Sequence, residues 1–328
     1  MQKYNKLTQQ ELWAVRPVLS PRTVILTLLL LAAVFIPLGA VCLHYGTSAV
    51  ELISRYDDIC IPGKTDNSGK ENLLNLANGA GTTCDVSITI PTTMKAPIYM
   101  YYRITNMYQN HRRYVQSVSE SQLIDRGVTQ ASLDRCKPQL YLDGNTNDVI
   151  RPCGLNAWTM FNDTYDVTHA SNGNTVRPRR SGIAWPADKN TRYSGAAFSN
   201  FNTLPALRGG LEKTGFLNDA EDLMVWMRTA TLPNFIKLYG VIEEDLPAGT
   251  ELTVRVANRY NTYRFNGTKS IVLSTTTWLG GKNPVLGIVG LITGCLSLLM
   301  AVLFFLVIRY QPRQLGDLSY LSWNQKAP

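Results

Sequence analysis

The sequence predicts a membrane protein in which two transmembrane helices enclose a large exoplasmic ectodomain that is β-rich, antiparallel and sandwich-like, with long loops and two disulfides. Three observations carry this prediction. Two apolar stretches near the ends of the 328-residue chain are long enough to cross a bilayer. Four of the six cysteines fall in the polar region between them. The same region alternates apolar and polar residues with the two-residue period of β-strands.

The two apolar stretches cover residues 24–43 and 286–308, with 20 and 23 residues and no charge in either. A helix needs about 20 apolar residues to cross a hydrocarbon core of ~30 Å. A cleaved signal peptide is the alternative for the first stretch. Its apolar run, however, is longer than usual and follows a 23-residue polar and basic segment. We therefore predict transmembrane helices over residues 23–45 and 284–308.

The charges that flank these stretches predict the orientation of the chain. Seven basic and two acidic residues lie outside residues 46–283: Lys3, Lys6, Arg16, Arg22, Arg309, Arg313, Lys326, Glu11 and Asp317. Because Lys and Arg concentrate on the cytoplasmic flanks of membrane helices, we predict that the tails, 1–22 and 309–328, are cytoplasmic. Residues 46–283 then form an exoplasmic or lumenal ectodomain. The protein is expected in a membrane of the secretory pathway: the endoplasmic reticulum, Golgi, endosome or plasma membrane.

The net charge of +8 does not indicate nucleic-acid binding. The ectodomain holds 25 of the 32 Lys and Arg residues and 22 of the 24 Asp and Glu residues, so it has only three more basic than acidic side chains. The remaining positive charge lies in the tails, where membrane topology explains it. We therefore expect membrane lipids, and no nucleic acid, among the partners.

The six cysteines divide between two environments. Four lie in the ectodomain, at Cys60, Cys84, Cys136 and Cys153, and two lie inside the apolar stretches, at Cys42 and Cys295. Four cysteines in an oxidising compartment indicate two disulfides, for which three pairings are possible. Closing the shorter loops would join Cys60 to Cys84 and Cys136 to Cys153. A zinc site is the alternative, but the chain has no Cys-x-x-Cys and its three histidines are scattered.

Two N-glycosylation sequons, Asn162-Asp-Thr and Asn266-Gly-Thr, both fall inside the ectodomain. We expect Asn162 and Asn266 to carry glycans. The first sequon belongs to a stretch, residues 151–165, that also contains Trp158 and Phe161. We expect this stretch to be anchored by burial of the two aromatic side chains and to display Asn162 to solvent. Binding of a partner protein is one possible role of this stretch, and a purely structural role is the alternative.

Period-two alternation predicts antiparallel strands in the ectodomain. The segments are 84–90, 98–104, 223–227, 238–242, 252–256 and 271–273. Residues 172–215 are rich in Gly, Pro, Asn and Arg without a sustained period, which predicts long loops. Within them, Arg177-Pro-Arg-Arg resembles a dibasic processing site, and a solvated run of charge is the alternative.

Motifs that carry catalysis are incomplete. Gly63-Lys-Thr lacks the first glycine of a phosphate-binding loop. Asp188-Lys-Asn-Thr lacks the Thr-Gly that follows the lysine in the phosphorylated motif of P-type ATPases. Serine-hydrolase and metalloprotease motifs do not occur. We therefore predict that the protein is not an enzyme and has no catalytic residue, cofactor or metal site.

Glycines form a candidate packing face in the second apolar stretch. Gly290 and Gly294 form a small-xxx-small pair, and Gly287 lies one turn earlier. Without large side chains, another helix can approach such a face closely. We predict that these three glycines pack against a neighbouring helix, including one of a partner; a lipid-facing cluster is the alternative.

Several uncommon motifs occur in one order along nearly the whole chain. They are QQ at 9–10, RYDDIC at 55–60, YQNHRRYV at 108–115, PCGLNAWTMFNDTY at 152–165, VWMRTA at 225–230, LSTTTWLGGKNP at 273–284 and GDLSYLSW at 316–323. The sequence thereby resembles the cell division control protein 50 family, whose members are accessory β subunits of type IV P-type ATPases, the phospholipid flippases.

The resemblance implies a non-catalytic subunit that forms a heterodimer with the catalytic α subunit of such an ATPase. It implies that the chain supports the stability of the ATPase, its exit from the endoplasmic reticulum, its transport cycle and thus lipid asymmetry. A two-span ion channel or a membrane-tethered receptor with a disulfide-bonded ectodomain is the alternative. The apolar stretches, however, offer only scattered Thr and Ser instead of the polar stripe of a pore.

Overall fold

The structure is a computed structural model, and it divides the chain into two compact units. It describes residues 10, 20–63, 66–76, 81–193, 195–201 and 215–312. The helical unit comprises the terminal parts of the chain up to Ser48 and from Asn283 onward, and the ectodomain comprises Ala49–Lys282. The predicted tails, including the QQ and GDLSYLSW motifs, lie almost wholly outside the described residues.

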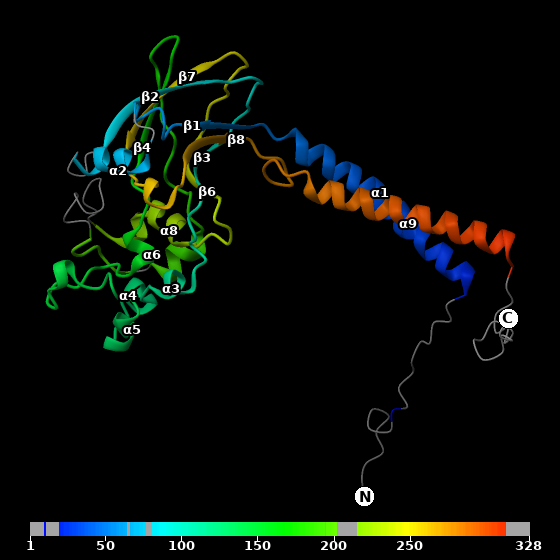
Figure 1. Ribbon diagram of the computed structural model, residues 1–328, viewed down its shortest axis with the longest axis horizontal. Coiled ribbons are helices and arrows are strands. Elements are labelled where there is room, and N and C mark those ends of the chain that lie inside the picture. The colour runs from blue at the N-terminus through cyan, green and yellow to red at the C-terminus, as the bar shows by residue number, and fades with distance from the viewer. Residues whose placement is uncertain are drawn as a thin grey trace, which may run out of the picture. The chain divides into compact units, whose positions relative to one another are not determined.

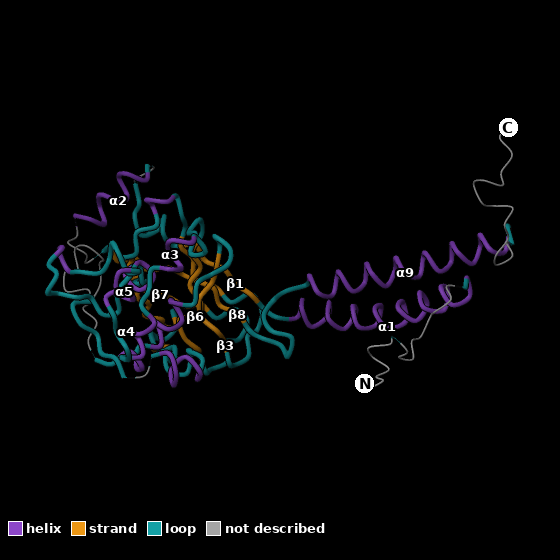
Figure 2. The backbone as a smooth tube through the Cα atoms, turned by 90° about the horizontal axis from the view of Figure 1, so that it is seen from below, coloured by secondary structure: helices purple, strands orange, loops and turns teal. Residues whose placement is uncertain are grey.

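Two long helices make up the helical unit. Helix α1 spans Pro21–Ser48 and helix α9 spans Val285–Tyr310, and both are long and apolar enough to cross a membrane. They run antiparallel and side by side (Figures 1 and 2). Neither helix contains an acidic residue. Most of the large apolar side chains of the two helices are exposed, as expected for helices that contact lipid or another membrane helix.

The described residues of the ectodomain form two four-stranded antiparallel sheets (Figure 1). One sheet has the order β1 (Glu51–Arg55), β8 (Lys269–Ser274), β3 (Ile98–Ile104) and β6 (Phe235–Ile242). The other has the order β2 (Thr82–Thr89), β7 (Glu251–Asn258), β4 (Thr164–His169) and β5 (Thr175–Val176). Strand β8 therefore lies between β1 and β3, although more than 200 residues of chain separate it from β1. The β-rich, sandwich-like fold class with two disulfides is confirmed.

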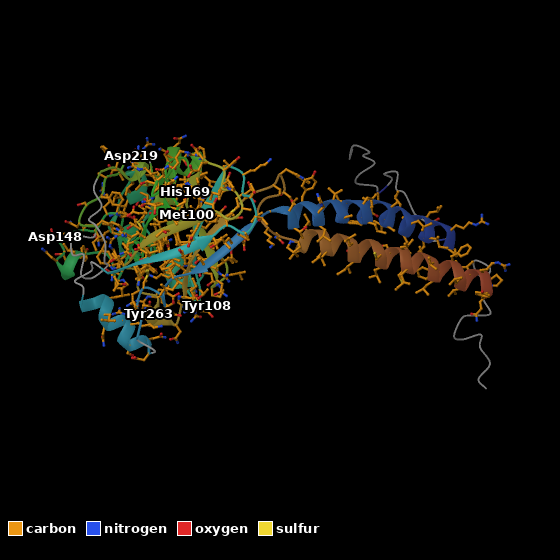
Figure 3. All side chains as sticks on the ribbon, turned by 90° about the horizontal axis from the view of Figure 1, so that it is seen from above. Met100, Tyr108, Asp148, His169, Asp219 and Tyr263 are labelled. Atoms are coloured by element: carbon orange, nitrogen blue, oxygen red, sulfur yellow. A yellow bond between two sulfur atoms is a disulfide. The ribbon has the colours of Figure 1, made fainter. Side chains whose placement is uncertain are left out.

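Side chains from both sheets belong to one continuous hydrophobic core. Strand β3 shows the expected alternation, since Ile98, Met100, Tyr102 and Ile104 are buried and the residues between them are only partly buried. In Figure 3, Met100 lies in the interior of the ectodomain and Asp148 lies at its edge. Burying such apolar side chains contributes ~1.5–3 kcal/mol each.

Short helices occupy the connections between strands. They are α2 (Asn67–Leu76), α3 (Arg112–Gln116), α4 (Glu120–Ile124), α5 (Gln130–Asp134), α6 (Leu155–Trp158) and α8 (Glu221–Met227). The strand predicted at 223–227 is wrong, because these residues lie in α8. Their burial follows a helical spacing, with Leu223, Met224, Trp226 and Met227 all at most 2% exposed. Two acidic residues in the first turn favour that helix.

Candidate functional sites

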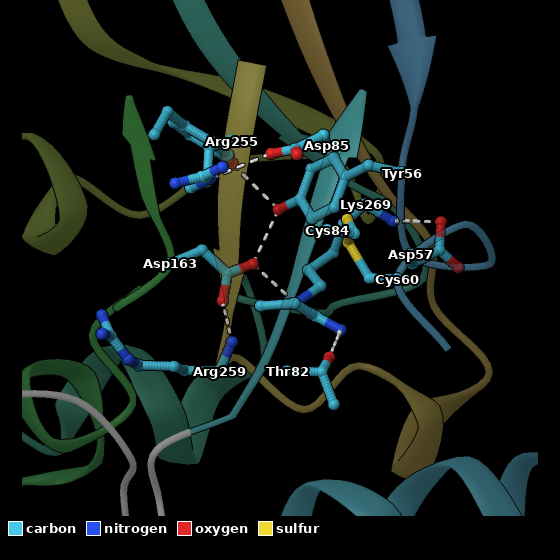
Figure 4. The surroundings of a disulfide bond; sticks show 12 residues. Tyr56, Asp57, Cys60, Thr82, Cys84, Asp85, Asp163, Arg255, Arg259 and Lys269 are labelled. Atoms are coloured by element: carbon cyan, nitrogen blue, oxygen red, sulfur yellow. Dashed lines mark hydrogen bonds and ion pairs between the residues drawn. A yellow bond between two sulfur atoms is a disulfide. The ribbon is translucent and has the colours of Figure 1, made fainter. Parts of the chain in front are cut away.

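A fully buried ion pair joins the two sheets. Lys269, the first residue of β8, donates from Nζ to Oδ2 of Asp163 over 2.6 Å, and both side chains are 0% exposed. The same ammonium donates to the carbonyl oxygen of Tyr260 over 2.6 Å and to the side-chain oxygen of Asn258. All three N–H donors of the lysine are therefore used. Figure 4 shows this cluster beside the Cys60–Cys84 disulfide.

The Asp163 carboxylate is equally well satisfied. Its Oδ1 accepts backbone N–H bonds from Arg259 and Tyr260 over 2.5 and 2.6 Å, and its Oδ2 also accepts from the Tyr56 hydroxyl over 2.7 Å. Burial, reinforced by the Asp163 charge, raises the pKa of Tyr56 well above its ordinary value, so Tyr56 stays a neutral donor. Burial lowers the pKa of Lys269, and the Asp163 carboxylate opposes that shift. The cluster thus holds the sheets together.

Two disulfides brace the ectodomain. Cys60 is bonded to Cys84 on β2 with 4.9 Å between Cα atoms, and Cys136 to Cys153 with 5.5 Å. Of the three pairings that the sequence allows, this is the one with the shorter loops. Cys42, in the helical unit, is a buried free thiol.

The stretch at 151–165 is anchored through its aromatic residues. Phe161 is 7% exposed and stacks on Tyr102 of β3 with ring centroids 3.9 Å apart. Trp158 is half-buried and meets Phe201 edge to face. Asn162 lies between the buried residues Phe161 and Asp163 and is itself half-buried, so it is less displayed than its sequon suggested. A glycan there would leave the protein from a recessed position.

The second sequon lies at the surface. Asn266 is exposed and adopts a left-handed backbone conformation, with φ of 53°, at the end of a 3-10 turn over Tyr263–Phe265. Its side-chain oxygen accepts a hydrogen bond of 2.5 Å from Asn67 on α2. The bond uses only the side-chain oxygen, so the amide nitrogen, to which a glycan attaches, takes no part in it.

The three glycines of α9 pack against α1 of the same chain. A Cβ atom on Gly287 would lie 2.4 Å from the Leu43 backbone nitrogen, and one on Gly294 would lie 2.7 Å from Ile36 Cγ1. A Cβ atom on Gly290 would lie 3.0 Å from Cα of Gly39 on α1. The absence of side chains on α9 therefore lets the two spans approach closely. These contacts lie within one chain, so the packing of a partner's helix against the same glycines stays a prediction.

Lys237 on β6 is a second buried lysine, and the sequence pattern did not reveal it. It is 6% exposed, while its neighbour Ile236 is 47% exposed, which reverses the order expected for a surface strand. Its Nζ donates to the carbonyl oxygens of Val225, Trp226 and Arg228 at the end of α8. Burial lowers the pKa of Lys237 to about 7. The only local signal for such a cap is a lysine with apolar strand neighbours on both sides, in a strand that follows a helix end.

The run at 177–180 lies along the edge of β6. Arg179 exchanges backbone hydrogen bonds with Val241, and its guanidinium pairs with Glu243 over 2.7 Å. Arg180 pairs with Asp222 and stacks over the Tyr239 ring. A protease needs an extended, accessible segment, so these contacts favour a structural role for the basic run. Among the described residues, no group of three or more His, Cys, Asp or Glu side chains is arranged to hold a metal ion.

Comparisons with known proteins place the chain among relatives of similar length. The model of the LEM3 (ligand-effect modulator 3) family / CDC50 family matches residues 42–314. The chain is 45% identical to putative ALA-interacting subunit 4 of Arabidopsis thaliana, over 98% of this chain and 94% of that protein. It is 34% identical to cell cycle control protein 50A of Bos taurus, over 93% and 88%. It is 32% identical to the phospholipid-transporting ATPase accessory subunit LEM3 of Saccharomyces cerevisiae, over 99% and 87%.

Proposed function

The chain belongs to the LEM3/CDC50 family, and from this membership we propose that it is a non-catalytic accessory subunit of a phospholipid-translocating P-type ATPase. The observation that carries the proposal is similarity over almost the full length to proteins named for that role. Two yeast relatives, at 32% identity each, are named phospholipid-transporting ATPase accessory subunits. Plant relatives at 44–45% identity are named ALA-interacting subunits.

The partner in this proposal is the catalytic α subunit of a type IV P-type ATPase, in a heterodimer. The chain would stabilise that subunit, accompany it out of the endoplasmic reticulum and support its transport cycle. The architecture suits a supporting role, because covalent and ionic cross-links make the ectodomain rigid. The Cys60–Cys84 disulfide and a fully buried ion pair constrain the sheets, and the Cys136–Cys153 disulfide joins two of the connections. A rigid surface binds a partner with little loss of conformational entropy.

The orientation belongs to the same proposal. We place both termini in the cytoplasm and the ectodomain on the exoplasmic or lumenal side. The antiparallel pair α1 and α9 supports this placement, since it brings both tails to one side of the bilayer. The disulfides support it too, because they persist in oxidising compartments. Glycans on Asn162 and Asn266 would mark the same side.

The proposal is tested by purifying the full chain in mild detergent from cells that express it and identifying its companions by mass spectrometry. We expect a P-type ATPase in near-equal amount. Depleting the chain should then trap that ATPase in the endoplasmic reticulum, which is read from its glycosidase sensitivity or its location by microscopy. Recovery of the chain without any P-type ATPase, in several detergents that keep it folded, would contradict the proposal.

A further inference from the structure

A short hairpin connects β8 to α9. Thr277 and Gly280 exchange two backbone hydrogen bonds of 2.8 and 2.9 Å, and Gly280 has a φ of 114° that favours glycine. Trp278 and Leu279 therefore form the tip of a closed two-residue turn. Trp278 is 67% exposed, which is unusual for the largest apolar side chain. We call residues 275–282 the Trp278 hairpin.

The Trp278 hairpin is hydrogen-bonded at its start to the chain that leaves α1, and the residue that follows it is hydrogen-bonded to the last turn of α1. At its start, Thr275 donates from its backbone nitrogen to the carbonyl oxygen of Val50, and Val50 donates back to the Thr275 hydroxyl, each over 2.9 Å. Just after its end, Asn283 donates to the carbonyl oxygen of Gly46 over 3.0 Å. Val50 lies two residues beyond the end of α1, so the hairpin begins and ends where the spans end.

The lengths of the spans place those ends at the level of the lipid headgroups. At ~1.5 Å per residue, the 28 residues of α1 and the 26 residues of α9 are about 42 and 39 Å long. A bilayer including its headgroups is about 40–45 Å thick. The three residues from Thr275 to Trp278 reach at most about 11 Å. Trp278 is thus confined to the neighbourhood of the membrane surface by covalent connection.

The composition of the hairpin matches that surface. Residues 275–282 contain no acidic side chain and one basic side chain, Lys282, which is exposed. Indole rings prefer the headgroup level, where the ring contacts lipid and the N–H contacts water or headgroups, and lysine accompanies them there. We propose that the Trp278 hairpin is a membrane-surface anchor, in which Trp278 and Leu279 insert between lipid headgroups close to the ends of the spans. This inference requires two membrane spans but no ATPase.

The test measures quenching of tryptophan fluorescence by lipid. The full chain carries six tryptophans, of which Trp13 and Trp323 lie in the tails; a chain with both changed to Phe serves as the parent. It is reconstituted into nanodiscs of phosphatidylcholine, with or without phosphatidylcholine brominated in the upper acyl chain. We expect brominated lipid to quench the parent, and the further change Trp278→Phe to remove most of that quenching.

The matched control is Trp185→Phe. Trp185 is 64% exposed, nearly as much as Trp278, and lies in the ectodomain over 90 residues from either span, where it contacts the guanidinium of Arg228. We expect this control to leave the lipid quenching unchanged. Quenching that survives Trp278→Phe overturns the proposal. A Trp278 that is unquenched in nanodiscs, and whose emission shifts only when the ATPase is added, also overturns it and assigns the hairpin to the protein partner.

Discussion

Lys269 and Asp163 form an ion pair in which both side chains are fully buried, with 2.6 Å between Nζ and Oδ2. One residue starts a strand of the first sheet, and the other immediately precedes a strand of the second. A buried pair of this kind contributes little net stability over apolar residues, but losing one partner strands a charge in the core. The two sheets therefore depend on each other through these residues.

We expect Lys269→Met to destabilise the ectodomain by about 3–5 kcal/mol, because it leaves the Asp163 carboxylate buried without its counter-charge. Thermal unfolding of the purified chain measures the loss. Adding Asp163→Asn should recover part of it. The control is Asp85→Asn at the exposed pair with Arg255, where solvent screens the charges and we expect a much smaller loss. Equal losses for the exposed and buried pairs would show that burial does not govern the effect.

Removing the Cys60–Cys84 bridge with Cys84→Ser and Cys60→Ser should cost ~2–5 kcal/mol. We expect the double variant to be retained in the endoplasmic reticulum and to carry immature glycans there. Peptide mapping without reduction provides the chemical test of both bridges. Free thiols at these positions, or a peptide joining Cys60 to Cys136, would contradict the arrangement.

Two changes at the first sequon separate the glycan from the side chain that carries it. Thr164→Ala abolishes the sequon and keeps Asn162, whereas Asn162→Gln also alters a half-buried position beside Phe161 and Asp163. We expect both variants to lose one glycan on gels. Asn162→Gln should also lose about 1 kcal/mol of folding stability through lost packing, and should therefore be retained in the endoplasmic reticulum more strongly than Thr164→Ala. Asn266→Asp at the exposed sequon is the control and should fold normally, because Asp tolerates the left-handed backbone and keeps an oxygen to accept from Asn67. Identical behaviour of the first two variants would assign the whole effect to the glycan.

Gly290→Leu should separate the spans and thereby weaken recovery of the ATPase. A leucine there meets Gly39 of α1 at its first carbon, and overpacking of this kind costs about 1–3 kcal/mol. Val289→Leu, one position away and 54% exposed, is the matched control. Co-purification at equal expression measures the result. Undiminished recovery with Gly290→Leu would refute the predicted role of the glycine face.

Lys237 makes stability depend on pH. Its folded pKa of about 7 lies below the ordinary value of 10.5. Between these values the unfolded chain binds more protons than the folded chain, so the contribution of Lys237 to the free energy of unfolding rises with pH, by up to ~1.4 kcal/mol per unit. We expect Lys237→Met to flatten the rise between pH 7 and 9, measured by denaturant unfolding. The exposed residue Lys95, changed to Met, should leave the slope intact; an equal slope in the Lys237 variant would contradict the assignment.

Local patterns were sufficient for the elements whose surroundings repeat along the chain. A helix that crosses a bilayer is apolar on every side, so a sufficiently long, uncharged apolar stretch is enough to predict α1 and α9. Strand β3 has one face in the core, and its alternation is therefore visible in residues 98–104. All five residues at 223–227 are apolar, so they fit a two-residue period as well as a helical one; the structure buries Leu223, Met224, Trp226 and Met227, the spacing of one side of a helix.

The remaining features depend on residues that meet only in the folded chain. Strand β8 pairs with β1 across more than 200 residues, and no local signal encodes that register. A lysine ordinarily indicates solvent, yet Lys237 and Lys269 are buried, because backbone carbonyls and a distant carboxylate replace water around their charges. The sequence places glycines on α9, but only the tertiary structure decides that they face α1, because close approach is a property of two surfaces together.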